Sequence, residues 1–273
     1  MLDGYLSKSF LRRGNVRPGD QYGKEHFGFP DSISMAKIKG VNARPEDEKA
    51  GIVEPNVILL GYTAATGNST DLDPYQAWLK DGSFMAFREL RQLVPEFQSF
   101  CAETAKKFEH LNISGEFIAA RIIGRWKSGA PISLAPNEDN PELSGSQDFD
   151  YSDELKQERC PYAAHIRKAN PRIGGRPNAN HSLTLRRLMV LSSQRKKKKM
   201  NRTEENRGLL FVSYQSEVAD GFQHVQQAWC NSPNFPLQPV ANVSSGMDLL
   251  VGQNSDKSPR RAQNIVPLVS KLN

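Results

Sequence analysis

The sequence predicts a fold of the α+β class. From Phe84 to Leu111, apolar residues recur every three or four positions, which is the pattern of a helical face. The run RGLLFVSYQ, residues 207–215, is the strongest strand pattern, and GFQHVQQAW, residues 221–229, follows it as a helix. A strand–turn–helix order beside a long helical stretch favours α+β over a regular parallel sheet. With 273 residues, the chain can bury a sizeable core in one large or two small domains.

The first third of the chain predicts few regular elements. Residues 1–25 are rich in glycine and charge and indicate an irregular lead-in. HFGFPDSIS, residues 26–34, indicates an aromatic turn with Gly and Pro. Residues 42–75 contain many Pro, Gly, Asn and Asp around one strand-like run, VILLGY, residues 57–62. We therefore expect loop around a short extended segment.

The middle of the chain predicts helices and then a long loop. The helical pattern of residues 84–111 is interrupted near Pro95, which is expected to start a second helix. A further helix is expected over residues 114–126, with Ser114 as its N-cap. Residues 128–158 are polar and rich in proline, and indicate a long loop. No internal repeat is visible.

Composition limits the classes of protein that fit. The net charge is +6, but 36 basic and 30 acidic residues are interspersed, so there is no broad basic coat. No apolar run is long enough to span a membrane, and the first residues lack the apolar core of a signal peptide. An extracellular and a cytoplasmic location both stay open. Cys101, Cys160 and Cys230 form no CxxC pair, which excludes a thiolate zinc site and leaves one disulfide plus a thiol open.

One segment, QRKKKKMNR at residues 194–202, stands out for its charge. Such a run fits nuclear import or a nucleic-acid contact. It also fits a solvated loop, and no aromatic side chains interleave with the lysines as a stacking surface requires. We therefore do not expect nucleic-acid binding.

A single histidine carries the candidate chemistry. No two of the five histidines have metal-chelating spacing, and the chain has no phosphate-binding glycine loop and no GxSxG motif. In CPYAAHIRKANPR, residues 160–172, His165 follows two alanines and precedes several cations. A core histidine with both nitrogens satisfied fits this pattern. A ligand of haem iron also fits it, because haem needs only one protein ligand and arginines suit its propionates.

Five segments resemble the dye-decolorising peroxidases, in the same order. They are EHFGFPDSIS, DGSFMAFRELRQ, RWKSGAPISLAPNEDNPE, CPYAAHIRKANPR and RGLLFVSYQSEVADGFQHVQQAW. The likeness to the fungal members runs from about Glu25 to about Gly252. It implies a ferredoxin-like fold of the dimeric α+β barrel type, with most of the first ferredoxin-like half absent and the chain truncated at both ends. Residues 1–40 are then a remnant of the first half, and residues 41–273 are the haem-binding half with long loops at 128–158 and 190–206.

The resemblance implies the roles of three reacting groups. His165 is the expected ligand of the haem iron, Asp31 the distal acid–base residue and Arg186 the distal arginine. A carboxylate within reach of both peroxide oxygens can move a proton from one to the other. A guanidinium beside it stabilises the charge on the departing oxygen. Because the distal base is a carboxylate, with an ordinary pKa of about 4, we expect activity at acidic pH, roughly 3–5.

The resemblance also assigns the surroundings of the cofactor, haem b. Arg172 matches an arginine that binds a propionate, and Leu209 and Phe211 match residues on the distal face. Asp248 is expected to bond the ring nitrogen of His165 that lies away from iron. The alanines before His165 are interpreted as room for the flat macrocycle.

The expected activity is the oxidation of bulky phenolic or dye-like donors by hydrogen peroxide. Electrons from bulky donors would pass through aromatic side chains, with Tyr214 and Trp229 as candidates. Two departures from the family pattern stand out: Ser32 replaces the glycine after the distal Asp, and LMVLSSQRKKKK follows Arg187 in place of a Gly-rich turn. An inactive relic of the fold, with the basic run 195–199 as an anion or nucleic-acid contact, is the alternative.

Overall fold

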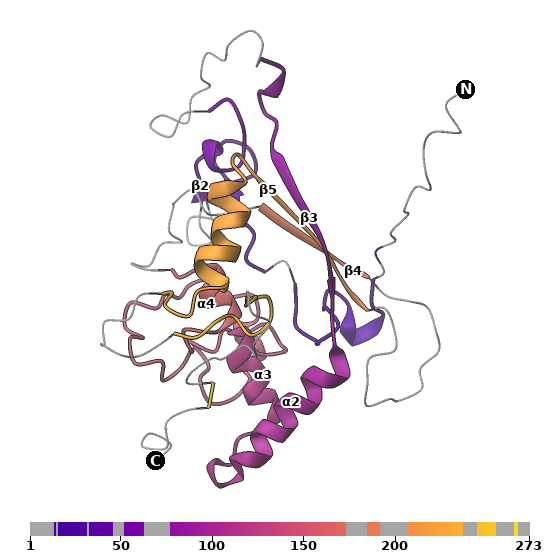
Figure 1. Cartoon of the computed structure of the whole chain (residues 1–273), viewed down its shortest axis with the longest axis vertical. Helices are drawn as coiled ribbons and strands as arrows, with labels where there is room; N and C mark the ends of the chain where they lie inside the picture. The colour runs from indigo at the N-terminus through magenta and orange to yellow at the C-terminus, as the bar shows by residue number, and fades with distance from the viewer. Residues whose placement is uncertain are drawn as a thin grey trace, which may run out of the picture.

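A computed structural model describes most of the chain. The described residues are 14, 16–31, 33–45, 52–62, 77–172, 185–191, 207–236, 245–254 and 265–266, with the backbone alone for 185–191. Ser32, the lysine block at 194–202 and all but residues 190 and 191 of the loop predicted at 190–206 lie outside them. The chain combines an antiparallel sheet with helices, which confirms the α+β prediction (Figure 1).

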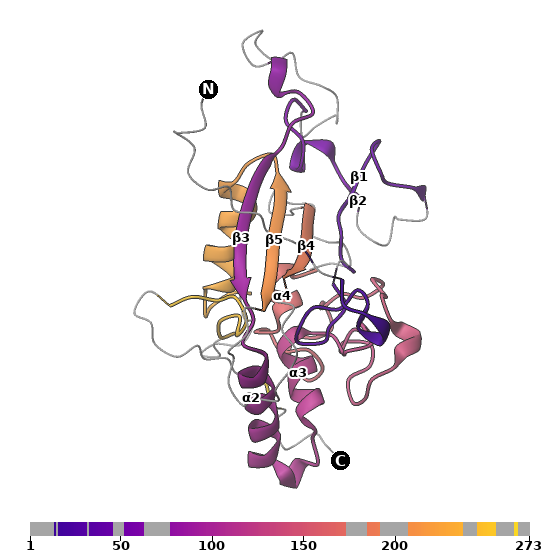
Figure 2. The same cartoon turned by 90° about the vertical axis from the view of Figure 1, so that its right-hand side faces the viewer.

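The sheet has three antiparallel strands in the order β3-β5-β4. The strands are β3, Phe84–Arg91, β5, Gly208–Gln215, and β4, Leu185–Leu191. The predicted strand 207–215 is thus confirmed, and it lies at the centre (Figure 2). The backbone of β5 passes so close to β3 that a Cβ on Gly208 would lie 2.2 Å from the Leu90 carbonyl oxygen. Only glycine fits there.

The helix predicted over the first part of residues 84–111 is wrong. Residues 84–91 form β3, which pairs with β5 along its whole length, from Phe84 with Gln215 to Arg91 with Gly208. The helix begins only at α2, Val94–Lys107, with Pro95 in its first turn as expected. The strand forms because β5, more than 100 residues away in sequence, supplies its hydrogen bonds.

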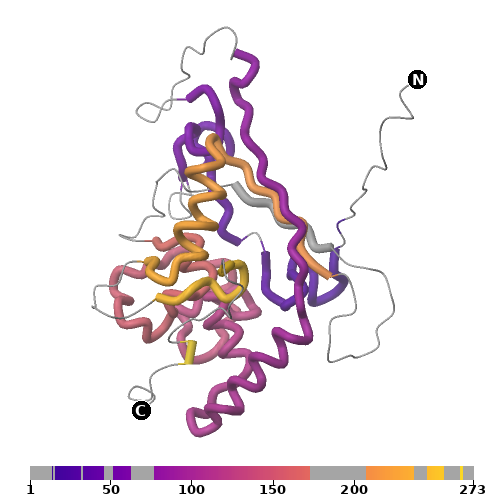
Figure 3. Tube along the Cα trace, in the orientation of Figure 1, coloured from indigo at the N-terminus to yellow at the C-terminus, as the bar shows by residue number. Residues whose placement is uncertain are grey.

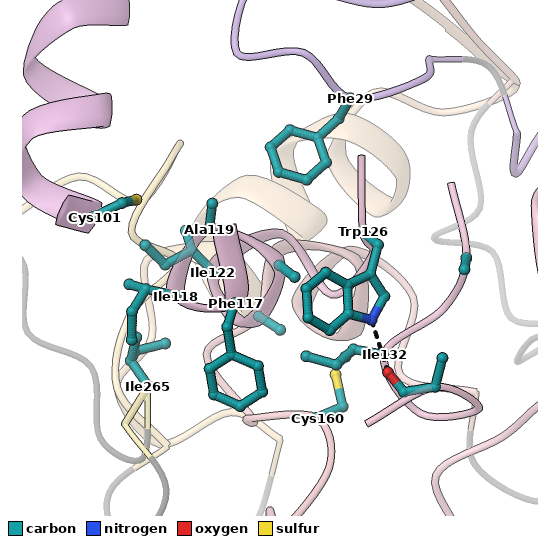
Figure 4. Packing of buried hydrophobic residues seen from close by; sticks show 14 of the residues in the cluster. Phe29, Cys101, Phe117, Ile118, Ala119, Ile122, Trp126, Ile132, Cys160 and Ile265 are labelled. Carbon is teal, nitrogen blue, oxygen red and sulfur yellow. Dashed lines mark hydrogen bonds between the residues drawn. The ribbon is translucent and has the colours of Figure 1, made fainter. Parts of the chain in front are cut away.

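The main core surrounds α3, Gly115–Ile123 (Figure 4). The Ser114 side chain accepts a hydrogen bond from the Phe117 N–H, which confirms the predicted N-cap, and Gly124 ends the helix in a left-handed conformation. Helix α2 packs beside α3, and the Trp126 indole donates to the Ala135 carbonyl at 2.7 Å. This core carries the segment that contains His165.

Two π-helical segments, η8 at Ala219–Gln223 and η9 at Val225–Cys230, form the helix predicted over residues 221–229. This helix runs along one face of the sheet (Figures 1 and 3). On this face the ring centroids of Phe222 and Phe211 lie 5.6 Å apart. Its end packs against α4, the five-residue helix His165–Ala169.

The strand predicted at 57–62 is wrong. A 3₁₀ turn, Pro55–Val57, and further turns occupy this region, and the extended pair nearby is formed by β1, Lys37–Ile38, and β2, Ile52–Val53. The Val57 carbonyl accepts from Ser216 instead of a neighbouring strand. The loop expected at 128–158 is confirmed apart from one 3₁₀ turn, Pro141–Leu143.

The described residues answer two questions that the composition raised, on membrane-spanning helices and on disulfides. None of the helices in the described ranges is long and apolar enough to cross a membrane. No disulfide joins the three buried cysteines, so the disulfide that the sequence left open does not form in this structure.

Candidate active site

His165 and Asp248 form a buried hydrogen-bonded pair. Asp248 Oδ2 lies 2.7 Å from His165 Nδ1, and the carboxylate is completely buried whereas 28% of the imidazole is exposed. Helix α4 presents His165 at its first residue. The pairing at Nδ1 fixes the ring and leaves Nε2 as the nitrogen available to a metal. A core histidine with both nitrogens satisfied is thus the poorer interpretation.

The turn that holds Asp248 favours its ionised form. Burial alone raises the pKa of Asp248, but the charge and hydrogen bond of His165 and the Val251 and Leu250 N–H groups hold it below the ordinary value. Leu250 N–H donates to Oδ1 at 2.8 Å and Val251 N–H at 3.1 Å. A Cβ on Gly252 would lie 2.5 Å from the Asp248 carbonyl oxygen, so glycine is required for this turn to close.

The alanines before His165 have a different role from the one expected. Ala163 and Ala164 are buried in the main core, and the end of α3 packs onto them. A Cβ on Gly124 would meet the Ala164 Cβ at 3.6 Å and Ile166 Cγ1 at 2.4 Å. Their small size therefore allows α3 to approach the segment, and the interpretation as room for a macrocycle is wrong.

Arg172 lies in a buried cluster after α4. Its Nη1 donates to the Gln147 carbonyl at 2.8 Å, and its Nη2 donates to Gln147 Oε1. The guanidinium lies 4.2 Å from the centroid of the Phe149 ring. Burial lowers the pKa of Arg172, and Tyr151 partly offsets this.

Gln147 also connects Arg172 to the segment that contains Asp31. The Gln147 amide donates to the Ile33 carbonyl at 3.0 Å and accepts from Ser34 Oγ at 3.1 Å. Ile33, Ser34 and the segment after α4 therefore meet at one side chain, although they are far apart in sequence.

A buried carboxylate, Glu25, organises the turn before Asp31. It accepts the Phe27 N–H at 2.7 Å and the Phe29 N–H at 2.8 Å, and the Gln92 amide also donates to it. Burial raises the pKa of Glu25, although these hydrogen bonds oppose the shift. The Asp31 N–H donates to the Gly23 carbonyl at 3.0 Å, which closes the turn and places Asp31 half-buried at its end.

The remaining predicted residues lie on the sheet. Leu209 and Phe211 are half-buried and alternate along β5, so they lie on one face, the face that Phe222 covers. Arg186 is placed by its backbone alone: it is the register partner of Ser213. Ser213 is two residues along β5 from Phe211, so the backbone of Arg186 lies beside this part of the strand.

The two aromatic candidates differ in their surroundings. Trp229 is buried and stacks on Phe235 with a centroid distance of 5.0 Å and an interplanar angle of 3°. Tyr214 is half-buried against the small apolar cluster that includes Ile38 and Ile58. Trp229 thus reaches half-buried Phe235 through direct ring contact.

Sequence reasoning missed three residues of this region: Arg125, Gln147 and Lys168. Arg125 and Lys168 stand inside the quoted segments RWKSGAPISLAPNEDNPE and CPYAAHIRKANPR, where nothing in the sequence distinguishes them from surface cations. Gln147 lies in a polar loop with no such signal. Among the described residues no cluster of His, Cys, Asp and Glu could hold a bare metal ion.

The comparisons with known proteins agree on one family. The family model described as "Dyp-type peroxidase, C-terminal" matches residues 64–236. A dye-decolorizing peroxidase of Mycetinis scorodonius is 36% identical over 288 residues, which cover 100% of this chain and 54% of that protein. One from Auricularia auricula-judae is 35% identical and covers 96% of this chain and 53% of that protein.

Solved structures give the same result. The structure of an ancestral D-type dye-decolorizing peroxidase has a TM-score of 0.77 to this chain at 40% sequence identity, and the match covers 90% of this chain and 56% of that one. A dye-decolorizing peroxidase in complex with 2,6-dimethoxyphenol has a TM-score of 0.74 and covers 89% and 56%. The chain spans about half the length of the curated relatives that it matches.

Proposed function

Since the chain belongs to the dye-decolorising peroxidase family, we propose that it binds haem b and uses hydrogen peroxide to oxidise bulky phenolic or dye-like donors. The observation that carries this proposal is the His165–Asp248 pair at 2.7 Å. It leaves imidazole Nε2 for iron and supplies a carboxylate that makes the ring a stronger ligand. The relatives support a haem peroxidase, whereas the assignment of individual residues is our own.

The residues of this chain fit a haem with one protein ligand. His165 would hold the iron through Nε2, and Asp248 would keep the imidazole in the required tautomer. Arg172 would face a propionate, and Leu209 and Phe211 would lie over the porphyrin. When bound, haem supplies the iron at which the peroxide O–O bond is cleaved.

Asp31 and Arg186 would handle the proton and the charge. Asp31 would accept a proton from one peroxide oxygen and return it to the other, which would leave as water. Arg186 would stabilise negative charge on the departing oxygen. Electrons from donors too large to enter the site would reach it through Trp229, which stacks on Phe235, or through Tyr214.

Titration of the protein with hemin tests the proposal most directly. We expect a shifted Soret band in the parent and its loss in His165→Ala. The matched control is His110→Ala, because His110 is exposed on a different segment and should leave the spectrum unchanged. A His165→Ala spectrum that matches the parent would disprove the ligand assignment.

The alternative, an inactive relic, differs in two measurements. A relic gives no Soret shift and no turnover of dye with hydrogen peroxide. The relic's proposed anion contact, residues 195–199, lies outside the described residues. Retention of the Soret shift without turnover would indicate that the chain binds haem and lacks the distal groups in working positions.

A further inference from the structure

Arg125 has a buried guanidinium nitrogen without a hydrogen-bond partner. The residue is 4% exposed, and its Nη1 donates to the Gly129 carbonyl at 2.8 Å and the Ser146 carbonyl at 3.0 Å. Its Nη2 is buried and makes no hydrogen bond. An unpaired charged donor in the interior is strongly unfavourable, so this nitrogen points to a missing acceptor.

A second buried guanidinium lies beside it. Arg125 and Arg172 lie 5.4 Å and 4.2 Å from the centroid of the same Phe149 ring, and Arg172 is 7% exposed. Burial, and after it the charge of Arg172, lower the pKa of Arg125 to about 10. The described groups that raise the pKa of Arg125 are Tyr151 and Cys160, and neither is a carboxylate. Two like charges are therefore close together, and no described carboxylate is among the groups that act on either of them.

The position of the pair relative to His165 indicates which anion. Arg172 is the third residue after α4, the helix of five residues that begins with His165. A helix of five residues is about 7.5 Å long, so His165 and Arg172 lie near enough along the chain for one flat ligand to be held by its centre at His165 and by its edge at Arg172. Resting on the proposed function, we infer that Arg125 and Arg172 together bind one propionate of haem, with Arg125 Nη2 as a donor to it.

Gln147 marks the route by which the carboxylate reaches the pair. Its side-chain oxygen accepts from Arg172 Nη2, and the residue is only half-buried. A propionate oxygen replaces this neutral acceptor and reaches Arg125 Nη2 with its other oxygen. Charge-assisted hydrogen bonds from two guanidiniums are stronger than the amide contact that they replace.

The test compares haem with haem dimethyl ester, in which both carboxylates are blocked, in the full chain. Binding is followed by the Soret band and by quenching of tryptophan fluorescence, so no turnover is needed. We expect the parent to bind haem about tenfold or more tightly than the ester. Arg125→Gln should weaken the binding of haem but not of the ester, and so remove most of this preference. Arg125→Lys should keep part of the preference.

The control is Arg121→Gln. Arg121 is equally buried, but its nitrogens donate to the carbonyls of Ile265, Glu158, Arg159 and Gln157. Its loss should lower stability and leave the preference for haem over the ester unchanged. If Arg125→Gln does not fold, Arg125→Lys carries the comparison.

Two results would overturn the inference and differ from each other. If the parent binds haem and the ester equally, or if Arg125→Gln and Arg125→Lys weaken both porphyrins equally, the pair holds no propionate although haem binding stands. If the parent binds neither porphyrin, the proposed function fails and the inference fails with it.

Discussion

Buried cations in this chain are bonded mainly to backbone carbonyls. Arg121, Arg167 and Lys168 are almost completely inaccessible, and each donates to several carbonyl oxygens. Arg167 also lies 4.0 Å from the centroid of the Tyr162 ring. Carbonyl dipoles and aromatic faces replace part of the lost hydration, so a charge can stay inside without a carboxylate.

Lys168 gives a prediction about stability. Its ammonium donates to the Ser232 carbonyl at 2.7 Å, to the Phe235 carbonyl and, more weakly, to the Trp229 carbonyl at 3.4 Å. Lys168→Met keeps the length of the side chain but leaves these carbonyls unpaired, so we expect a loss of about 2–3 kcal/mol in the free energy of unfolding. Denaturant unfolding measures it, with the exposed Lys107→Met as the control.

The same substitution should change the pH dependence of stability. Burial lowers the pKa of Lys168 to about 8, and the charges of Cys230 and Asp248 only partly oppose it. Between this value and the unfolded pKa of about 10.4, the unfolded chain binds a proton that the folded chain does not. Stability contributed by Lys168 therefore rises with pH through this window. If the stability of Lys168→Met rose with pH by the same amount as that of the parent, Lys168 would not be the group responsible.

Asp31 gives the prediction for the proposed reaction. Asp31→Asn keeps the shape of the side chain but cannot accept the peroxide proton, so the rate of reaction with hydrogen peroxide should fall about 10²–10⁴-fold. Stopped-flow spectroscopy of the haem-loaded protein measures it between pH 3 and pH 7, within the range expected for a carboxylate base. Asp220→Asn, at an exposed position on η8, should react like the parent. Full reactivity of Asp31→Asn would exclude Asp31 as the base.

Among the elements, the contact between α3 and α4 positions His165. Gly124 ends α3 with φ +97°, and the space where its Cβ would lie is filled by Ile166, the residue after His165. The geometry of the imidazole is therefore coupled to the end of a helix in the main core. No polar interaction is needed for this coupling.

Gly124→Ala should disturb both stability and haem ligation. The left-handed φ costs about 1 kcal/mol for alanine, and the clash with Ile166 raises the loss to about 2–3 kcal/mol. Gly145→Ala measures the cost of the left-handed φ alone, since Gly145 has φ +76° and no atom within 4 Å of the added Cβ. Thermal unfolding and hemin titration measure the two effects. Equal losses in both variants would show that Ile166 yields freely.

The elements that sequence reasoning predicted correctly have local signals. Ser114 caps α3 through its own side chain, and residues 208–215 are β-branched and aromatic enough to indicate a strand. Residues 84–91 were misassigned because Phe84, Phe87 and Leu90 have helical spacing by coincidence. Their hydrogen bonds come from β5, and no local pattern reports a partner so distant in sequence.

The same distinction applies to the candidate site. The resemblance singled out His165 and Asp248, and the structure brings these two together although they are 83 residues apart. It did not single out Arg125, because an arginine after a helix looks like any surface cation in sequence. Its missing hydrogen bond becomes visible only when the loops around Gly129 and Ser146 enclose it.

At the scale of the whole molecule, the two sides of the sheet are covered unequally. The π-helical segments lie over one face, where Phe211 meets Phe222. On the other face, Tyr214 packs against the cluster around Ile38, but Met85 and Phe87 on β3 are 58% and 49% exposed. Strand β3 is also at the edge of the sheet, with no strand beyond it among the described residues. Exposed apolar side chains at a sheet edge favour association.

We therefore expect the chain to self-associate through β3 as its concentration rises. Phe87→Lys places a charge at the centre of the exposed strand, where a second strand would pair, and should weaken association about tenfold. Phe100→Lys is the control, because Phe100 is also 49% exposed but lies on α2, where no backbone hydrogen bonds are available to a partner. Sedimentation velocity over a range of concentrations measures the effect. Equal weakening by both substitutions would mean that apolar area alone drives association, and that the strand edge has no part in it.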